Sequence, residues 1–524
     1  MKSKRCEIFI LAVVLLAQSF IFALYGAHKP YIHMDEAYSL GLANYKRVEI
    51  QENGDFYNTW HSGDYYADYL TVNKDELCDF RAVYENQKND VHPPFYYLLL
   101  RFFMNAFPEK LTFWHGLLLN IVIYAFITVF AYLISQSLLV GQRYVKEKAV
   151  VIAFVSSLTL ASLTNVLFIR MYSLSALLML VTLYLHLRLR QSEKYIPLCL
   201  CIAISALIGS LTHYYYLFYL FALYCISAFF YIYKKQYNRF LIYTYILAAA
   251  GGMSIIIFPY SINHLFSGYR GHGAISKLGG FSGHSESLFL FLDKLNRFGF
   301  NGLLWVLALL IICLWIYKKL LRKGGDINRE AYIRLTVTFI SAVFYFAITS
   351  VSSPYIELRY ILPVCGMLLI VLFCYLYHLF RSILCEKRCN ILLVALACIM
   401  LCFPIASNTE PESLYSDRAG AVSYTEENSS VPAVYFLKSQ NNRFLDDIYL
   451  FAKTDSSYIA KDAEINEQSI AEIFKGVDIS HGVTVYINEG QNDEEILKCT
   501  ARALGLEDSE LLFSLNACKV YRIG

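Results

Sequence analysis

Long apolar runs alternate with short polar segments along residues 1–406 of the chain. Each run has roughly 17–25 residues, which is the length that an α-helix needs to cross a bilayer. The runs are 8–25, 113–138, 149–168, 171–189, 196–212, 215–233, 240–260, 299–318, 333–351, 358–379 and 390–406. A further apolar stretch, 94–107, is too short to span and is typical of a helix in the membrane surface. The pattern predicts an α-helical polytopic membrane protein with about 11 transmembrane helices.

Clusters of Lys and Arg predict the orientation of these helices. Lys2, Lys4 and Arg5 precede the first run, and further basic clusters recur at every second boundary. These clusters occupy 143–148, 188–194, 234–239, 318–329 and 381–388. Because cytoplasmic loops are enriched in Lys and Arg, the N-terminus is expected in the cytoplasm. A cleaved signal peptide is the alternative for the first run, but that run is long and no Ala-x-Ala site follows it.

After residue 406 the pattern changes. Short strand-like runs (433–437, 483–487 and 517–523) alternate with helical ones (469–475 and 494–504). Residues 407–524 contain 20 Asp and Glu but only 10 Lys and Arg, so this part is acidic whereas the remainder is basic. We therefore expect a membrane domain over 1–406 and an acidic extracytoplasmic α/β domain over 407–524, in which Cys499 and Cys518 could pair.

Composition narrows the class of protein. The chain of 524 residues is 57% hydrophobic and only 17% charged, whereas a soluble domain carries about 25% charged residues. A soluble enzyme is thereby excluded, and the net charge of +3 argues against a nucleic-acid partner. Tyr outnumbers Phe, 43 to 37, and the surplus hydroxyls are expected at membrane interfaces or in a polar cavity.

The first candidate catalytic residues are Asp35 and Glu36, which directly follow the first apolar run. A carboxylate at a low-dielectric boundary can act as a general base toward a hydroxyl, and the pair could also bind a divalent cation. The alternative is structural, because acidic residues stabilise the N-terminus of a helix beginning near residue 37.

Other ionisable residues stand beside Tyr at outward-facing junctions. His92 precedes two prolines, Arg170 lies in Phe-Ile-Arg-Met-Tyr-Ser, and His213 lies in Thr-His-Tyr-Tyr-Tyr. Arg359 and Tyr360 follow in Glu-Leu-Arg-Tyr. Each alone is compatible with an interfacial anchor, and the planar guanidinium of Arg also suits a phosphate. Their convergence on one membrane face favours a site there.

The outer loop 261–298 contains several glycines interleaved with Arg270, His272, Lys277 and His284. It lacks the Gly-Lys-Ser/Thr ending of a nucleotide P-loop. A cationic flap over an anionic ligand and a plain flexible linker are both open interpretations. The chain also lacks an ATP-binding motif and a Ser-His-Asp elbow signature. The energy for any reaction must therefore come from an activated substrate.

Taken in order, these motifs resemble the GT-C superfamily of polyprenyl-phosphate-sugar-dependent glycosyltransferases. They are Asp-Glu-Ala after the first span, His-Pro-Pro-Phe-Tyr-Tyr-Leu-Leu-Leu, Arg-Met-Tyr-Ser-Leu, Thr-His-Tyr-Tyr and Leu-Arg-Tyr-Ile-Leu-Pro. The resemblance covers residues 8–380 and is closest to the bacterial branch (glycosyltransferase-39-like) similar to protein O-mannosyltransferases and the lipid A aminoarabinose transferase. It implies transfer of a hexose-type sugar from a polyprenyl-phosphate donor to a hydroxyl acceptor outside the cytoplasm.

The resemblance also implies roles for single residues. Asp35, with Glu36 beside it, matches the catalytic acidic position, while Arg170 and Arg359 are candidates for binding the donor phosphate. The candidates for the substrate pocket are His92, Tyr97, Tyr172, His213, Tyr214 and Tyr360. A cofactor is not required by this chemistry, although Asp35 and Glu36 leave a divalent cation open. The first loop is long, so the acceptor (protein, lipid or cell-envelope glycan) stays open.

A transporter or flippase of a lipid-linked saccharide is the alternative function. Such proteins usually show internal repeats and charges near the middle of the membrane. Here no repeat is visible and the ionisable residues lie at the ends of spans, which favours the enzyme.

Overall fold

The computed structural model describes residues 2–44, 50–190, 192–280, 283–320, 327–438 and 443–524. Their contacts divide the chain into two compact units. The helical unit comprises Met1–Gly26, Val91–Tyr96 and Leu117–Ser413. The α/β unit comprises Ala27–Asp90, Tyr97–Gly116 and Leu414–Gly524. The sequence predicted one domain over 1–406 and another over 407–524. In the structure most of the first loop belongs to the same unit as the C-terminal residues.

The helical unit is built from apolar helices that account for all eleven predicted runs. Within the described residues, eight helices are long and apolar enough to cross a membrane by themselves. They are α1 (Lys2–Ala27), α6 (Trp114–Leu138), α9 (Tyr172–Leu189), α11 (Tyr216–Tyr233), α12 (Tyr237–Ile257), α17 (Arg329–Ser352), α18 (Leu362–Ile383) and α19 (Glu386–Ala406). Two bent pairs and the 16-residue helix α10 (Tyr195–Ser210) correspond to the other three runs. The chain is an α-helical, multi-pass membrane protein.

Asn301 links the two bent pairs. Helices α7 (Val145–Ser156) and α8 (Leu160–Leu167) meet at 61°, and α15 (His284–Lys294) and α16 (Leu304–Leu320) meet at 90° after a π-helical turn, Leu295–Gly299. Asn301 lies in the second break, where its Oδ1 accepts the N–H of Leu160 at 2.9 Å, so it also caps α8. Its amide donates to the carbonyl of Met400. One buried side chain therefore satisfies the first N–H of α8 and also the carbonyl of Met400, which has no helical partner because Pro404 lacks an N–H.

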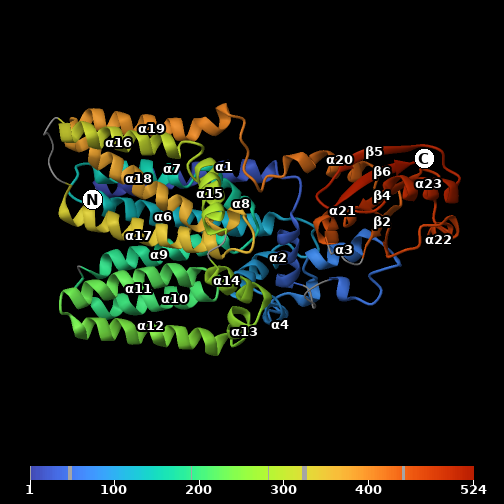
Figure 1. The fold of residues 1–524 in the computed structure, drawn as a ribbon, viewed down its shortest axis with the longest axis horizontal. Helices are drawn as coiled ribbons and strands as arrows, with labels where there is room; N and C mark the ends of the chain where they lie inside the picture. The colour runs from blue at the N-terminus through green and yellow to red at the C-terminus, as the bar shows by residue number, and fades with distance from the viewer. Residues whose placement is uncertain (1, 45–49, 191, 281–282, 321–326, 439–442) are drawn as a thin grey trace. The chain divides into compact units, whose positions relative to one another are not determined.

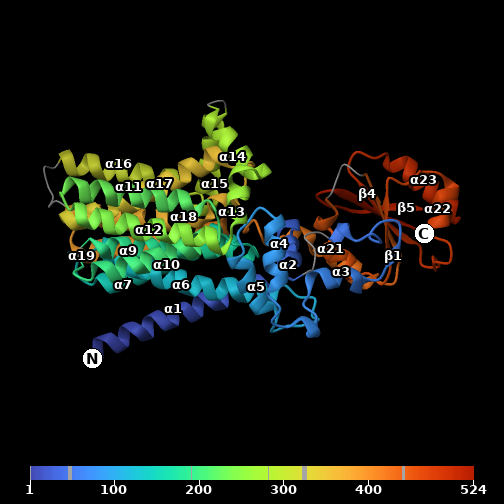
Figure 2. The same ribbon diagram turned by 90° about the horizontal axis from the view of Figure 1, so that it is seen from below.

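Helix α18 forms the core of the helical unit (Figure 1). It packs against α7, α9, α16, α17 and α19, and 83% of its apolar window is buried, compared with 11% for α1 and for α12. The two weakly buried helices present their apolar side chains outward, as expected for contact with lipid. Figure 2 shows α1 diverging from the other helices toward its N-terminus.

The Gly-rich segment 261–298 is largely helical rather than a loop. Its described residues form α13 (Tyr260–Phe266), α14 (Tyr269–Gly279) and α15. Figure 2 shows α14 extending away from the long helices. The Lys277 ammonium donates to the carbonyls of Ser353 and Pro354, at 2.8 and 3.0 Å, and so attaches α14 to the end of α17. The interpretation as a plain linker does not fit these helices.

A six-stranded mixed sheet organises the α/β unit. Its strand order is β1-β3-β2-β4-β6-β5. The strands are β1 (Trp60–His61), β2 (Ala433–Leu437), β3 (Ser457–Lys461), β4 (Val483–Asn488), β5 (Ser509–Ser514) and β6 (Cys518–Ile523). Strand β2 pairs in parallel with β3 and β4, and the other pairs are antiparallel. The predicted strands β2, β4 and β6 are confirmed, whereas β1, β3 and β5 were not predicted.

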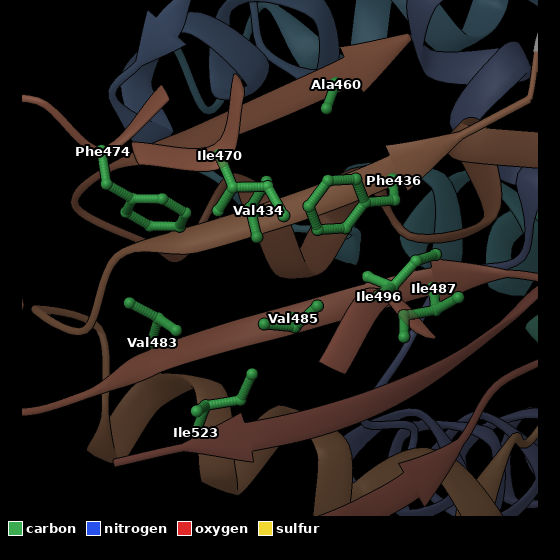
Figure 3. Packing of buried hydrophobic residues seen from close by; sticks show 10 residues of the cluster. All are labelled: Val434, Phe436, Ala460, Ile470, Phe474, Val483, Val485, Ile487, Ile496 and Ile523. Atoms are coloured by element: carbon green, nitrogen blue, oxygen red, sulfur yellow. The ribbon is translucent and has the colours of Figure 1, made fainter. Parts of the chain in front are cut away.

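Helices cover both faces of this sheet. On one face, α22 (Glu467–Ile473) and α23 (Asp493–Leu504) enclose an aliphatic core that includes Val434, Phe436 and Val485 (Figure 3). On the other face, Tyr435 and Tyr486 stack at 5.8 Å and contact aromatic residues of η6 (Arg443–Asp446) and α21 (Ile448–Phe451). Alternation along β2 and β4 produces this division.

The predicted pairing of Cys499 with Cys518 is wrong, since both thiols are free. Cys499 lies on α23 and packs on the aliphatic core, whereas the Cys518 thiol contacts Asp447 on the opposite face. The sheet lies between them, so no disulfide can form without rebuilding it.

The first loop contributes four helices and an edge strand to the α/β unit. The helices are α2 (Met34–Asn44), α3 (Gly63–Leu70), α4 (Arg81–Asn89) and α5 (Phe95–Met104). Strand β1 aligns Trp60 with Tyr458, and the Trp60 indole donates to the carbonyl of Ile473 at 2.8 Å. Helix α5 has 10 residues, which confirms that the 94–107 stretch is a short helix.

Candidate active site

Glu36 is a structural member of the turn that opens α2. Its Oε2 accepts the backbone N–H of His33 at 2.9 Å and the Lys29 ammonium at 3.0 Å. The first contact is that of a capping box, in which the third helical residue closes back on the N-cap. Both charged side chains are fully buried, and burial lowers the pKa of Lys29 while Glu36 opposes that effect. The helix-capping interpretation therefore describes Glu36 well.

Asp35 has a different environment in the same turn. Its Oδ2 lies 3.7 Å from Nδ1 of His33, and its backbone N–H donates to that nitrogen at 3.1 Å. The Asp35 side chain is 8% exposed, so the carboxylate is nearly buried. The two adjacent carboxylates therefore differ in their contacts, because Glu36 is held between Lys29 and the backbone whereas Asp35 faces His33.

A second group of predicted residues meets in the helical unit. The His92 and His213 rings lie 6.2 Å apart, and the Tyr172 ring lies 5.3 Å from that of His213. Tyr360 contacts Tyr172 edge-on at 6.4 Å. Tyr215, which was not predicted, contacts both His213 and Tyr360, at 5.2 and 5.8 Å. Sequence positions from four separate segments therefore converge on one cluster, which we call the His-Tyr cluster.

Electrostatics indicates which ligand the His-Tyr cluster suits. The pKa of His213 is lowered well below its ordinary value, chiefly by burial and further by His92, Arg170 and Arg270. His213 is therefore neutral at pH 7, whereas Arg170 remains charged although only 4% exposed. The Tyr360 hydroxyl is buried and has no hydrogen-bond partner among the residues described. A buried cation beside an unused hydroxyl suits a polar, anionic ligand.

Local hydrogen bonds fix the segments that supply these side chains. Asn120 of α6 donates to the carbonyls of Val166 and Phe168, at 3.0 and 2.9 Å, and accepts from the Ser173 hydroxyl. These bonds hold the turn between α8 and α9 on which Arg170 lies. The N–H of Phe95 donates to the carbonyl of Leu211 at 2.9 Å, which ties the His92 segment to the turn carrying His213.

Three further predicted residues have other contacts. Tyr214 bonds through its hydroxyl to Nδ1 of His264 on α13, at 2.9 Å. Arg359 lies over the ring of Tyr360 at 5.4 Å, and its charge acts on Glu412. Tyr97 is a fully buried residue of α5. Of the two predicted phosphate ligands, Arg170 is the one whose charge acts on the histidines.

A metal centre is not visible in the described parts of the chain, where no three His, Cys, Asp or Glu side chains gather to hold an ion. The two carboxylates that were considered for a divalent cation have separate partners, because Glu36 bonds to Lys29 and Asp35 faces His33.

Lys29, Tyr215 and Arg270 were not among the site candidates chosen from the sequence. Tyr215 belongs to a run of three tyrosines. Which of them faces the His-Tyr cluster depends on where the following helix begins, and the sequence does not show that. Arg270 was noted as part of a Gly-rich segment, and its relation to His213 depends on the fold of that segment. Lys29 precedes Glu36 by seven residues and follows no periodic pattern.

No family model and no curated protein matches this chain. Among solved structures, ArnT from Cupriavidus metallidurans in the apo state is similar over 98% of this chain and 97% of ArnT, with 12% identity and a TM-score of 0.45. The archaeal oligosaccharyltransferase AglB from Archaeoglobus fulgidus, in complex with an inhibitory peptide and a dolichol-phosphate, is similar over 99% of this chain and 74% of AglB. The identity is 11% and the TM-score 0.47. Both are GT-C superfamily members, and at such identities the likeness concerns the fold alone.

Proposed function

We propose that the protein is a membrane glycosyltransferase. It moves a hexose-type sugar from a polyprenyl-phosphate donor to a hydroxyl acceptor (protein, lipid or cell-envelope glycan) on the outer face of the bacterial plasma membrane. The observation that carries this proposal is the His-Tyr cluster, in which buried Arg170 and His92 accompany a neutral His213 and the unused hydroxyl of Tyr360. A sugar phosphate needs both a cation for its phosphate and neutral polar groups for its hydroxyls.

The chemistry assigns one task to each group. The acceptor oxygen attacks the anomeric carbon, the bond from that carbon to the phosphate oxygen breaks, and its electron pair leaves with the polyprenyl phosphate. Asp35 takes the proton of the acceptor hydroxyl, as a general base. Arg170 stabilises the charge that develops on the leaving phosphate. In-line attack inverts the anomeric carbon, and a product with retained configuration would contradict this route.

The test is a transfer assay with polyprenyl-phosphate hexoses, comparing the wild type with Asp35→Asn. The variant is expected to lose about 10²- to 10⁴-fold in kcat, the range for removal of a general base. Asp64→Asn serves as the control, since Asp64 is an exposed acid of the same loop, on α3. Undiminished transfer by a folded Asp35→Asn protein would remove Asp35 from the mechanism.

The same preparation separates transfer from transport. If vesicles containing the wild type move the labelled donor between leaflets and yield no glycosylated product, the protein is a flippase and the proposal of transfer is wrong. Product formation that depends on Asp35 contradicts the transport function, because moving a lipid needs no base.

A further inference from the structure

C-terminal residues of the α/β unit contact the turn that carries Asp35. The Tyr31 hydroxyl donates to the backbone carbonyl of Asp446, and the N–H of Met34 donates to Asp446 Oδ1 at 3.3 Å. The ring of Tyr415 stacks on that of His33, with centroids 5.9 Å apart and planes within 12°. Three positions within four residues of the turn are thus held by residues that follow them by more than 380 positions.

The contacts of His33 determine its orientation and its tautomer. Because Nδ1 accepts the N–H of Asp35 at 3.1 Å, the proton of the neutral ring is on Nε2. That nitrogen faces Oδ1 of Asp446 at 4.0 Å. Asp446 is 6% exposed, so its carboxylate acts on the ring with little screening by water. At this distance the Asp446 carboxylate acts on the ring through its charge and not through a hydrogen bond, while Nδ1 accepts from the Asp35 backbone.

We propose that Asp446 is a positioning residue for Asp35 and acts through His33 and the N-terminus of α2. This inference rests on the proposed function, in which Asp35 is the base. The buried charge of Asp446 favours the tautomer with the proton on Nε2, the ring nitrogen that faces it, so that Nδ1 accepts the N–H of Asp35. Its Oδ1 also accepts the N–H of Met34, the first residue of α2. The backbone at Asp35, and with it the direction of the catalytic carboxylate, is thereby fixed.

Through Asp446 and His33, the C-terminal residues would influence catalysis by Asp35. In the Ser-His-Asp triad, a buried aspartate holds the imidazole in one tautomer, and loss of its charge lowers kcat strongly. Here the imidazole orients a second carboxylate instead of a nucleophile. Misplacement of a reacting group by about 1 Å can lower a rate about 10²-fold, which sets the scale of the expected effect.

The first measurement is steady-state transfer by the full chain in detergent, with Asp446→Asn. We expect kcat to fall about 10- to 100-fold while KM for the donor stays within about twofold, because Asp446 does not touch the donor. Asp446→Glu, which keeps the charge, is expected to recover part of kcat. The control is Asp455→Asn, an exposed acid near β3.

A double-mutant cycle tests whether the effect passes through His33. In a His33→Ala background, Asp446→Asn is expected to lower kcat no further, since the ring that it orients is gone. Fully additive losses, or a rise in donor KM equal to the loss in kcat, would overturn the proposal.

Hydrogen exchange supplies a readout that does not require activity. Amides of residues 33–37 are expected to exchange faster in Asp446→Ala than in the wild type or in Asp455→Asn. Unchanged protection would overturn the positioning role even if transfer is observed. Faster exchange together with no transfer by the wild type would support the contact and contradict the proposed glycosyltransferase function instead.

Discussion

Asp447 should make the stability of the α/β unit depend on pH. Its carboxyl is fully buried, and burial first, then the neighbouring charge of Asp446, raises its pKa from 3.8 to about 7. The Cys518 thiol donates to Oδ2 at 3.4 Å, while Oδ1 has no hydrogen-bond partner in the part of the chain that the structure describes. The groups around it are Tyr31, Arg418, Tyr435, Asp446, Tyr486 and Cys518.

The sign and size of the effect follow from these values. The folded state keeps this proton up to about pH 7, whereas the unfolded chain releases it near pH 3.8, so the free energy of unfolding falls as pH rises between them. About three pH units, at about 1.4 kcal/mol each, correspond to about 4 kcal/mol. Asp447→Asn places a neutral amide of the same shape there, so it should match the wild type near pH 4 and be more stable at pH 8.

The assay is hydrogen exchange of peptides covering 444–451 and 516–524, in full-length wild type and Asp447→Asn between pH 5 and 8. Both proteins are compared at each pH, so the intrinsic pH dependence of exchange cancels. Asp455→Asn is the control and should keep the wild-type slope. If wild type and Asp447→Asn lose protection equally as pH rises, the buried carboxyl does not bind the proton and the reasoning is wrong.

Two further predictions concern charges that the fold buries. Lys29→Met and Glu36→Gln should each destabilise the α/β unit by about 3–5 kcal/mol, because each leaves an unpaired buried charge. The double variant should recover most of the loss, and thermal unfolding of the three proteins measures this; additive losses would contradict the ion pair. Arg170→Gln should raise donor KM about 10- to 100-fold, from the loss of charge-assisted hydrogen bonds, whereas exposed Arg188→Gln at the far end of α9 should not. Equal donor KM values for all three enzymes would exclude Arg170 as a phosphate ligand.

Much of the fold could be predicted because a membrane span is a local feature. Length and apolarity of a run decide it, and all eleven runs are helical in the structure. The bends at Asn301 were not predictable, since its bond to Leu160 joins positions 141 residues apart. Strand β1 was missed for a similar reason, because two residues carry no periodic pattern and only pairing with β3 makes them a strand.

The candidate site was predicted as a set of residues but not as an arrangement. His92, Tyr172, His213 and Tyr360 each stand at a span end on the same predicted face, and their rings lie close together in the structure. The choice of Tyr215 over Tyr214 depends on where α11 begins. Spacing alone does not distinguish Asp35 from Glu36, and only the family resemblance favoured Asp35 as the base.

The sequence by itself determined the class of protein, the number of apolar runs and the residue types available at their ends, because hydrophobic length and charge are properties of short segments. Tertiary structure alone decided which partners the two adjacent carboxylates have. Lys29 neutralises Glu36, and His33 faces Asp35 on one side and Asp446 on the other. Asp446 is 411 residues from Asp35 along the chain, and only the folding of the first loop into the C-terminal sheet brings such positions together.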